Sequence, residues 1–318
     1  MAAQVLVVGT FFPSVLEDLK GPFDILHVQN PAELEAKSDA ELTDVQGMAT
    51  NGWAPADVID RMPNLKLISS FGVGYDGVAA DHAASKNIIV THTPNVLNDD
   101  VANTAIMLLL AATRRLIEQD RYLRDGRWVK EGNAPLTRSV GGKTVGIVGL
   151  GRIGEAIAEK LGVFNCTVVY HSRNQKSGVS YRYYGDLVEM AEDCDILIAI
   201  TPGGPATNKL INRSVIEALG SEGTLINVAR GTVVDEAELV KALQDGRLGS
   251  AGLDVFEQEP KVPEQLFDMD NVVLTPHVAS ATWETRQAMS DLVVENLTSF
   301  FKSGSPISPV PECSHLIK

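Results

Sequence analysis

Short apolar runs alternate with amphipathic stretches along most of this chain. In the first third, the runs are QVLVVGT, DILHV, VQGMAT, LKLISSF and IIVTHT. From residue 143 a second series follows, with TVGIVGL, TVVYHS, DILIAIT, TLINVA, SAGLDVF and NVVLTPH. Strand-like runs separated by helical patterns are typical of α/β proteins with parallel sheets. We therefore predict an α/β fold with one smaller domain and a second domain whose six strands form two nucleotide-binding halves.

Three segments depart from this alternation. Residues 98–119 predict one long helix. Residues 121–142 are rich in Arg and Gly and lack clear periodicity, so we expect an extended arm there. Residues 282–302 place apolar residues at helical spacing, before the Pro-rich tail SGSPISPVPE. This late helix is free to return to the first domain.

Composition narrows the classes of partner. The chain has 318 residues, of which 44% are hydrophobic, so it can bury a substantial core in two domains. Its formal net charge of −14 argues against a nucleic acid or an anionic membrane surface as partner. The most apolar stretch, residues 105–112, is too short to span a bilayer, which needs about 20 apolar residues.

The cysteines and the N-terminus bear on the compartment. Cys166, Cys194 and Cys313 suggest neither a disulfide framework nor a metal-ligand cluster, so we expect no metal site. Free cysteines fit a reducing cytoplasm. The opening MAAQVLVVGT lacks the basic region of a signal peptide. We therefore expect a cytoplasmic protein.

A glycine-rich loop follows the first run of the second series. VGIVGLGRIG places Gly149, Gly151 and Gly154 in the G-x-G-x-x-G spacing, with a helical pattern and another strand-like run after it. Glycine permits a tight turn, a close approach of backbone to pyrophosphate, and close packing of helix on strand. Because strand, loop, helix and next strand appear in order, the context supports dinucleotide binding over a structural turn alone.

Arg173 stands close to the place where the ribose-reading residue of such a unit belongs. It lies in TVVYHSRN, at the tip of the second predicted strand. An acid there would accept a hydrogen bond from the ribose 2′-hydroxyl, whereas Arg173 with Ser172 offers a charge-assisted grip on a 2′-phosphate. Lys176 and Arg182 add to the positive field. The pattern therefore indicates NADPH, with NADH as the weaker alternative and a solvated loop arginine as the plainer interpretation.

Three later runs also end in functional groups. NVARG carries Arg230, GLDVFEQEP carries Asp254 and Glu259, and TPHVAS carries His277. Singly, each has an ordinary structural interpretation as a packed, paired or turn residue. At the carboxyl ends of parallel strands they can converge. Together they fit ketone reduction, which needs a cation for the substrate carboxylate and carbonyl, a general acid, and a carboxylate to orient an imidazole.

The motifs taken together resemble a known family. VGLGRIG, NVARG, GLDVFEQEP and TPHVAS, in this order and spacing, resemble the D-isomer-specific 2-hydroxyacid dehydrogenases. FGVGYDGV and PNVLNDDVANTAIMLLLAATRR extend the resemblance over almost the whole chain. The SSFGVGYDGV and HSR forms are most similar to NADPH-linked glyoxylate/hydroxypyruvate reductases and hydroxyphenylpyruvate reductases. Asn103 departs from the family, which often has Glu there, but that position usually lies away from the reacting centre.

The resemblance implies roles for individual residues. Arg230 would bind the substrate carboxylate and carbonyl, His277 would be the acid/base, and Glu259 would be its partner. Backbone amides of Val73 and Gly74 would also hold the carboxylate, and Asp254 would meet the nicotinamide amide. The implied cofactor-binding residues are Gly149, Gly151, Arg152, Ile153, Gly154, Ser172, Arg173, Asn174, Thr201, Pro202, Thr207, Val228, Ala229, Arg230, Asp254, His277 and Ala279.

The resemblance also implies the domain organisation. A flavodoxin-like substrate domain would comprise residues 1–98 and 285–318, and a Rossmann-type dinucleotide-binding domain would comprise residues 99–284. A hinge would let the domains close over the substrate. An arm at about 101–142 would join two copies into a homodimer.

These expectations favour an NADPH-dependent reductase of a small 2-oxo acid, with glyoxylate and hydroxypyruvate first, and hydroxyphenylpyruvate, phenylpyruvate-type acids and 2-ketogluconate next. A 3-phosphoglycerate dehydrogenase is disfavoured because no additional regulatory domain is evident. An L-lactate-type dehydrogenase would carry its glycine loop near the N-terminus, and formate oxidation does not need the Glu259–His277 pair. A nucleotide-sensing protein similar to the C-terminal-binding-protein corepressors stays as an alternative outside the enzymes.

Overall fold

The chain divides into two compact units. The computed structural model describes residues 2–317. Unit 1 comprises Met1–Leu97 and Ser280–Lys318, and unit 2 comprises Asn98–Ala279. The late helix, α13 (Trp283–Ser303), belongs to unit 1.

Unit 1 is built on a five-stranded parallel sheet in the order β2-β1-β3-β5-β7. This is the flavodoxin-like strand order once a separate two-stranded ladder of β4 (Trp53–Ala54) and β6 (Gly77–Val78) is set aside. The five strands are β1 (Gln4–Val8), β2 (Asp24–Val28), β3 (Val45–Thr50), β5 (Leu67–Ser70) and β7 (Ile89–Thr91). The remaining helices of the unit are α1 (Pro13–Lys20), α2 (Pro31–Glu35), α3 (Asp39–Leu42), α4 (Ala56–Asp60), α5 (Ala80–Ser85) and η4 (Pro311–Leu316).

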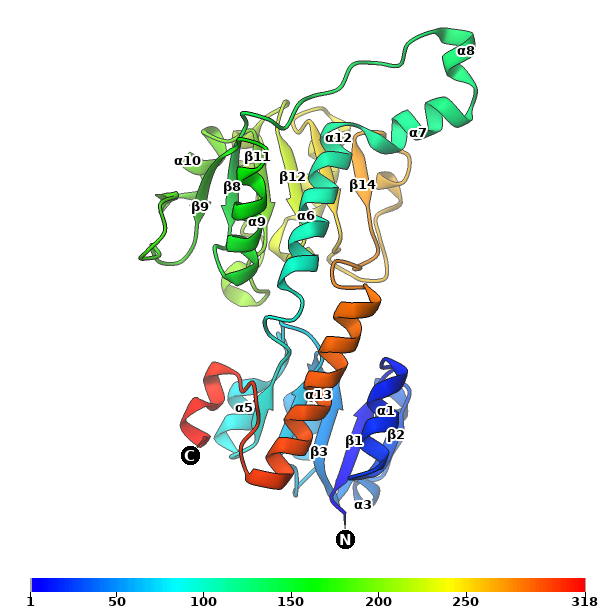
Figure 1. Ribbon diagram of the computed structural model, residues 1–318, viewed down its shortest axis with the longest axis vertical. Helices are drawn as coiled ribbons and strands as arrows, with labels where there is room; N and C mark the ends of the chain where they lie inside the picture. The colour runs from blue at the N-terminus through cyan, green and yellow to red at the C-terminus, as the bar shows by residue number, and fades with distance from the viewer. Residues whose placement is uncertain (1, 318) are drawn as a thin grey trace. The chain divides into compact units, whose positions relative to one another are not determined.

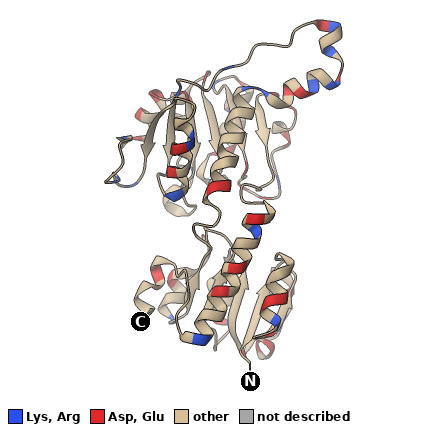
Figure 2. Cartoon of the chain, in the orientation of Figure 1, with Lys and Arg blue, Asp and Glu red and all other residues tan. Residues whose placement is uncertain are grey.

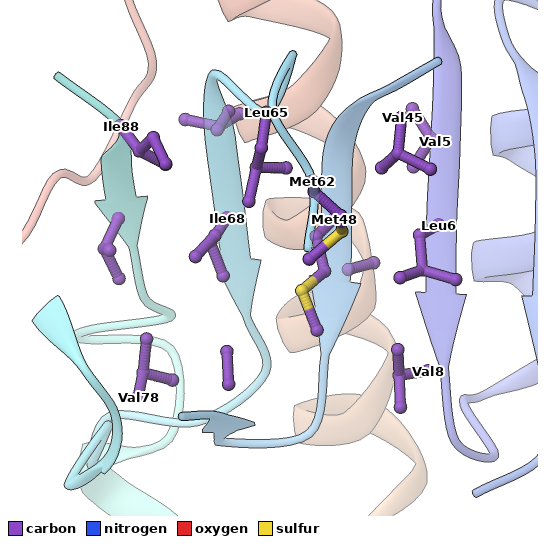
Figure 3. Packing of buried hydrophobic residues seen from close by; sticks show 14 of the residues in the cluster. Val5, Leu6, Val8, Val45, Met48, Met62, Leu65, Ile68, Val78 and Ile88 are labelled. Carbon is purple, nitrogen blue, oxygen red and sulfur yellow. The ribbon is translucent and has the colours of Figure 1, made fainter. Parts of the chain in front are cut away.

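Side chains of the strands form much of the core of unit 1. Helices cover the sheet, so strand residues on its covered faces are mostly apolar. Figure 3 shows apolar side chains of β1, β3 and β5 packed side by side, Leu6, Met48 and Ile68 among them. Helix α13 crosses this sheet (Figure 1), and Ser69 of β5 donates a hydrogen bond to the carbonyl of Val293 at 3.2 Å. The last long helix therefore completes the core that the first third of the chain begins.

Unit 2 is built on a seven-stranded parallel sheet in the order β10-β9-β8-β11-β12-β13-β14. Six of its strands match the predicted runs: β8 (Thr144–Val148), β9 (Thr167–His171), β11 (Ile196–Ala199), β12 (Thr224–Asn227), β13 (Ser250–Leu253) and β14 (Val272–Leu274). The prediction of six strands was wrong by one, because β10 (Arg182–Tyr184) adds a short strand at the edge. Three residues beside an edge give too little periodicity to be recognised from sequence.

The helices of unit 2 lie on both faces of its sheet. They are α6 (Asn98–Thr113), α7 (Leu116–Arg124), α8 (Arg127–Glu131), α9 (Arg152–Gly162), α10 (Leu187–Glu192), α11 (Arg213–Leu219) and α12 (Glu236–Gln244), with η1 (Pro205–Thr207), η2 (Gly231–Val233) and η3 (Glu264–Leu266). The single helix expected at 98–119 is wrong, because Arg115 has a left-handed backbone with φ of 47° and separates α6 from α7.

The arm of unit 2, residues 116–138, projects away from the sheet as two short helices followed by an irregular segment (Figure 1). The extended arm expected at 121–142 is therefore wrong at the end of α7 and at α8, which are helical. Figure 2 shows both charge signs along these helices, where Arg124 pairs with Asp120 and Arg127 with Glu131. Several large apolar side chains of the arm are exposed: Leu116, Ile117, Leu123, Trp128, Val129 and Leu136.

Within residues 2–317, no helix is both long enough and apolar enough to cross a membrane.

Candidate active site

The predicted functional residues of unit 2 follow the carboxyl ends of six parallel strands. Gly149 follows β8, Ser172 follows β9, Thr201 follows β11 and Arg230 follows β12. Asp254 and His277 follow β13 and β14 in the same way. Strand order reverses between β8 and β11, and ligands of open α/β sheets bind at such a switch point. The fold therefore brings residues from Gly149 to His277 in the sequence to one edge of one sheet.

The glycine loop between β8 and α9 has the geometry of a dinucleotide cradle. A Cβ on Gly154 would lie 2.3 Å from the carbonyl oxygen of Gly149, so only glycine lets the helix pack this close. Gly149 has φ of 106°, which side chains rarely adopt. A Cβ on Gly151 would meet nothing within 4 Å, which leaves space in front of the 11-residue helix α9. The backbone and the positive end of this helix fit a pyrophosphate.

The other predicted cofactor residues lie around this loop. Arg152 and Ile153 open α9, and Thr201 and Pro202 begin the segment after β11. Thr207 in η1 closes that segment by donating a hydrogen bond to the carbonyl of Pro202 at 2.7 Å. Val228, Ala229 and Ala279 are buried at the strand ends.

Arg173 is exposed at the tip of β9, and no described residue forms a hydrogen bond or ion pair with it. Its neighbours fix the backbone of the turn: Ser172 donates to the carbonyl of Asn174 at 2.7 Å, and Tyr183 donates to the carbonyl of Ser172 at 3.2 Å. Arg182, which the sequence offered as a further cation, pairs with Asp193 at 3.4 Å and stacks on Tyr184.

His277 and Glu259 form a hydrogen-bonded pair. His277 Nδ1 lies 2.7 Å from Glu259 Oε2. The second carboxylate oxygen, Oε1, accepts the backbone N–H of Phe256 at 3.0 Å, so the carboxylate is fixed at both ends. A carboxylate on Nδ1 leaves Nε2 of the imidazole for a substrate. The two side chains are 48% and 35% exposed, so the pair is accessible.

Asp254 holds the loop that carries His277. It is fully buried, and its carboxylate accepts hydrogen bonds from the Thr275 hydroxyl at 2.7 Å and from the amides of Val278 and Ala279 at 2.8 and 3.0 Å. His277 has φ of +53°, an uncommon backbone conformation for a residue with a side chain. These three bonds fix that conformation, a positioning role that the sequence did not reveal because its partners lie more than 20 residues away.

Arg230 follows β12 in a loop that is tied to the next strand. Its Nη1 donates to the carbonyl of Ala229 at 2.8 Å, and Asn227 donates to the carbonyl of Arg230 at 3.0 Å. A Cβ on Gly231 would lie 1.9 Å from the backbone carbon of Phe256. Glycine at this position therefore lets the arginine loop touch the segment that supplies Glu259.

An apolar cavity of about 280 Å³ adjoins the His277–Glu259 pair. The cavity is otherwise lined by Phe256, Pro260, Val262, Phe267, Leu274, Thr275 and Pro276. No group of three or more His, Cys, Asp or Glu side chains in the described part of the chain is arranged to hold a metal ion.

In unit 1, Val73 and Gly74 lie in the loop after β5. The Gly72 amide donates to the Thr93 hydroxyl at 2.9 Å, and the Thr93 amide donates back to the Gly72 carbonyl at 2.9 Å. His92 Nδ1 lies 2.9 Å from the carbonyl of Val73. Because residues 92 and 93 form hydrogen bonds with the carbonyls of Gly72 and Val73, the backbone conformation of this loop is fixed.

Comparison with known proteins places this geometry in a family. The model described as "D-isomer specific 2-hydroxyacid dehydrogenase, NAD binding domain" matches residues 106–279. Over 295 residues the chain is 48% identical to a glyoxylate/hydroxypyruvate reductase A of Arabidopsis thaliana, covering 92% of this chain and 94% of that protein. It is 52% identical to a hydroxyphenylpyruvate reductase of Plectranthus scutellarioides over 261 residues, covering 82% and 83%.

A solved structure is similar over almost the full length. The NADPH-dependent glyoxylate/hydroxypyruvate reductase of Sinorhizobium meliloti, in complex with NADP and malonate, has a TM-score of 0.94 and 48% identity. The match covers 98% of each chain.

Proposed function

This chain belongs to the D-isomer specific 2-hydroxyacid dehydrogenases, and from this we propose that it is an NADPH-dependent reductase of small 2-oxo acids, with glyoxylate and hydroxypyruvate as first substrates. The observation that carries the proposal is the 2.7 Å His277–Glu259 pair on the same sheet edge as a dinucleotide cradle. Unit 2 thereby combines an acid/base pair with the means to bind a hydride carrier.

The cradle residues fit NADPH. Open space at Gly151 and the N-terminus of α9 suit the pyrophosphate, and the exposed Arg173 suits a 2′-phosphate. When bound, the cofactor would supply the hydride that reduces the carbonyl carbon. Asp254, whose carboxylate already holds the loop of His277, is proposed also to meet the nicotinamide amide.

Proton delivery is the part of the reaction that the chain itself performs. His277 donates its Nε2 proton to the oxygen of the substrate carbonyl as that oxygen gains negative charge. Glu259 stabilises the imidazolium and keeps the ring oriented through Nδ1. Arg230 binds the substrate carboxylate and polarises the carbonyl. The product is the D-2-hydroxy acid.

Three further assignments belong to the proposal. The amides of Val73 and Gly74 contact the substrate carboxylate. The arm, with Trp128 and Leu136 among its exposed apolar side chains, joins two copies into a homodimer. The protein acts in the cytoplasm, where its three free cysteines stay reduced.

Bulkier acids are a second candidate substrate class. The relative from Plectranthus scutellarioides is named a hydroxyphenylpyruvate reductase, and one from Gluconobacter oxydans, 39% identical over 309 residues, is named a 2-ketogluconate reductase. The family thus includes relatives of this chain that take substituents larger than a hydroxymethyl group.

The test is the initial rate of absorbance loss at fixed protein, with NADPH or NADH, on glyoxylate, hydroxypyruvate, phenylpyruvate, hydroxyphenylpyruvate and 2-ketogluconate. NADPH-dependent turnover of glyoxylate or hydroxypyruvate above the others supports the proposal. Faster turnover of an aromatic acid or of 2-ketogluconate replaces the substrate assignment. Tight NADPH binding without turnover of any acid contradicts the proposal and favours a nucleotide-sensing protein.

A further inference from the structure

Lys176 lies in the loop after β9, three residues beyond Arg173. Its Nζ lies 2.8 Å from Glu155 Oε1 and donates to the carbonyl of Leu150 at 3.3 Å. Leu150 stands between the first two glycines of the cradle, and Glu155 lies in the first turn of α9. The ammonium of Lys176 is therefore held at the mouth of the dinucleotide cradle.

The backbone of this lysine is fixed as well. Its amide donates to the hydroxyl of Tyr170 at 2.9 Å. Tyr170 is fully buried in β9 and packs against Tyr183 with ring centroids 5.4 Å apart. Lys176 is thus anchored at both ends, and its position over the glycine loop does not depend on a freely moving surface side chain.

The basic side chains around the loop after β9 differ in how far they are already paired within the protein. Arg182 is paired with Asp193, and Arg173 has no ion-pair partner among the described residues. Lys176 is only partly paired. Its ammonium group has three N–H donors, and Glu155 and Leu150 use two of them. The third donor is left for an anion that approaches the glycine loop from the strand tip.

Glu155 has the opposite effect on such an anion. Its carboxylate neutralises Lys176 and would itself repel a second negative group nearby. Both side chains are partly exposed, at 38% for Lys176 and 42% for Glu155, so solvent screens the effect without removing it. The pair therefore sets how much positive charge is available beside Arg173.

We infer that Lys176 is a second ligand for the 2′-phosphate of NADPH and that Glu155 is a built-in competitor which weakens this contact. The inference rests on the proposed cofactor. Arg173 supplies the primary charge, Lys176 supplements it from the side of the glycine loop, and Glu155 keeps the affinity for the phosphate below the value that two cations alone would give. Removing the negative charge of Glu155 therefore strengthens the binding of NADPH.

The test measures dissociation constants and not turnover. Binding of NADPH and NADH is followed by cofactor fluorescence, and binding of 2′,5′-ADP and 5′-AMP is followed by calorimetry, which isolates the phosphate from the nicotinamide. The variants are Glu155→Gln, Lys176→Met and Lys176→Arg. Glu159→Gln is the matched control, since it makes the same change one turn further along α9 at an exposed position.

For Glu155→Gln we expect the Kd of NADPH and of 2′,5′-ADP to fall about three- to tenfold, because a screened charge pair contributes about 1 kcal/mol. For Lys176→Met we expect both constants to rise about tenfold. Lys176→Arg retains most of the affinity that Lys176→Met loses. In these variants the Kd values of NADH and 5′-AMP change less than twofold. In the Glu159→Gln control, every Kd changes less than twofold.

The opposite sign for Glu155→Gln overturns the inference. If this variant weakens NADPH and NADH equally, the pair is a structural clamp between loop and helix and not a competitor for phosphate. Unchanged 2′,5′-ADP binding in Lys176→Met removes the lysine from the phosphate site. Failure of the proposed cofactor is seen separately, in the unmodified enzyme, as equal affinity for 2′,5′-ADP and 5′-AMP. Melting temperatures of all variants show whether a loss reflects misfolding.

Discussion

Replacing Glu259 with Gln tests the acid/base pair with little change in side-chain size. In the native chain, Oε2 pairs with His277 Nδ1 at 2.7 Å and Oε1 accepts the Phe256 amide at 3.0 Å. The amide of Gln has one oxygen in place of two, and this oxygen cannot stand at both the Oε1 and the Oε2 position. Either the Phe256 amide faces an NH₂ group, or Nδ1 of His277 must become the acceptor. In both cases the negative charge beside the ring of His277 is lost.

The magnitude follows from the kind of bond and its exposure. A hydrogen bond to a charged group contributes about 1.5–3 kcal/mol, which is about ten- to a hundredfold in a rate or binding constant. Solvent screens this pair, because the His277 side chain is 48% exposed and that of Glu259 is 35% exposed. We therefore expect kcat to fall about ten- to thirtyfold, while the Kd of NADPH stays nearly constant because the lost charge lies beside the imidazole and not at the glycine loop or at Arg173.

The assay compares kcat for hydroxypyruvate and the Kd of NADPH in the unmodified enzyme, Glu259→Gln and Glu257→Gln. Glu257 is exposed two residues away, and the same substitution there should leave both constants unchanged. A kcat for Glu259→Gln within twofold of the unmodified value, with an unchanged melting temperature, would refute the view that the carboxylate assists proton transfer. A large rise in the Kd of NADPH would mean that the pair mainly shapes the cofactor site.

Further predictions concern other positions. Replacing His277 with Asn should lower kcat about 10²- to 10⁴-fold in steady-state assays and leave NADPH binding by fluorescence nearly intact; an unchanged kcat would remove the residue from the acid role. Replacing Arg173 with Asp should raise the KM of NADPH about ten- to a hundredfold and change that of NADH much less, and equal effects would contradict phosphate recognition. Asp195 bears on stability: burial raises its pKa, but hydrogen bonds from Lys143 and the Thr144 amide outweigh this and leave the pKa below its ordinary value. A lowered folded pKa stabilises the fold above about pH 4 and stops doing so as the pH falls through the folded value. Urea unfolding should therefore show Asp195→Asn less stable than the native chain near pH 7 and the difference shrinking at low pH; a constant difference would show that Asp195 contributes through shape and not charge.

The strand pattern of the chain could be predicted because it depends on local composition. All eleven apolar runs singled out in the sequence contain strands, and the glycine spacing 149–154 runs from the end of β8 into the first turn of α9 as expected. The chain belongs to the family that its motifs resembled, and its parallel sheets have the predicted α/β character. Buried strands and glycine loops leave clear signals in the sequence because they depend largely on neighbouring residues.

Several features of the fold were not predicted from the sequence. The backbone of Arg115 divides a helical pattern that reads as continuous, and the end of α7 and all of α8 form in the stretch 121–142, which lacks clear periodicity. The edge strand β10 is too short to be recognised alone and exists because it pairs with β9. At β10 a distant pairing supplies what local preference does not, whereas α8 has no buried residue and carries a local ion pair between Arg127 and Glu131.

The sequence by itself determined which chemical groups are present and in what order: a dinucleotide loop, a cation at a strand tip, and Arg230, Glu259 and His277 after later strands. Only the tertiary structure decided their geometry. In the folded chain, His277 lies 2.7 Å from Glu259, and Asp254 accepts hydrogen bonds from the loop that carries His277. Lys176 pairs with Glu155, which lies 21 residues earlier in the sequence. The physical reason is that parallel strands bring the ends of separate segments to one edge, and such distances depend on the packing of the whole sheet and not on any local stretch.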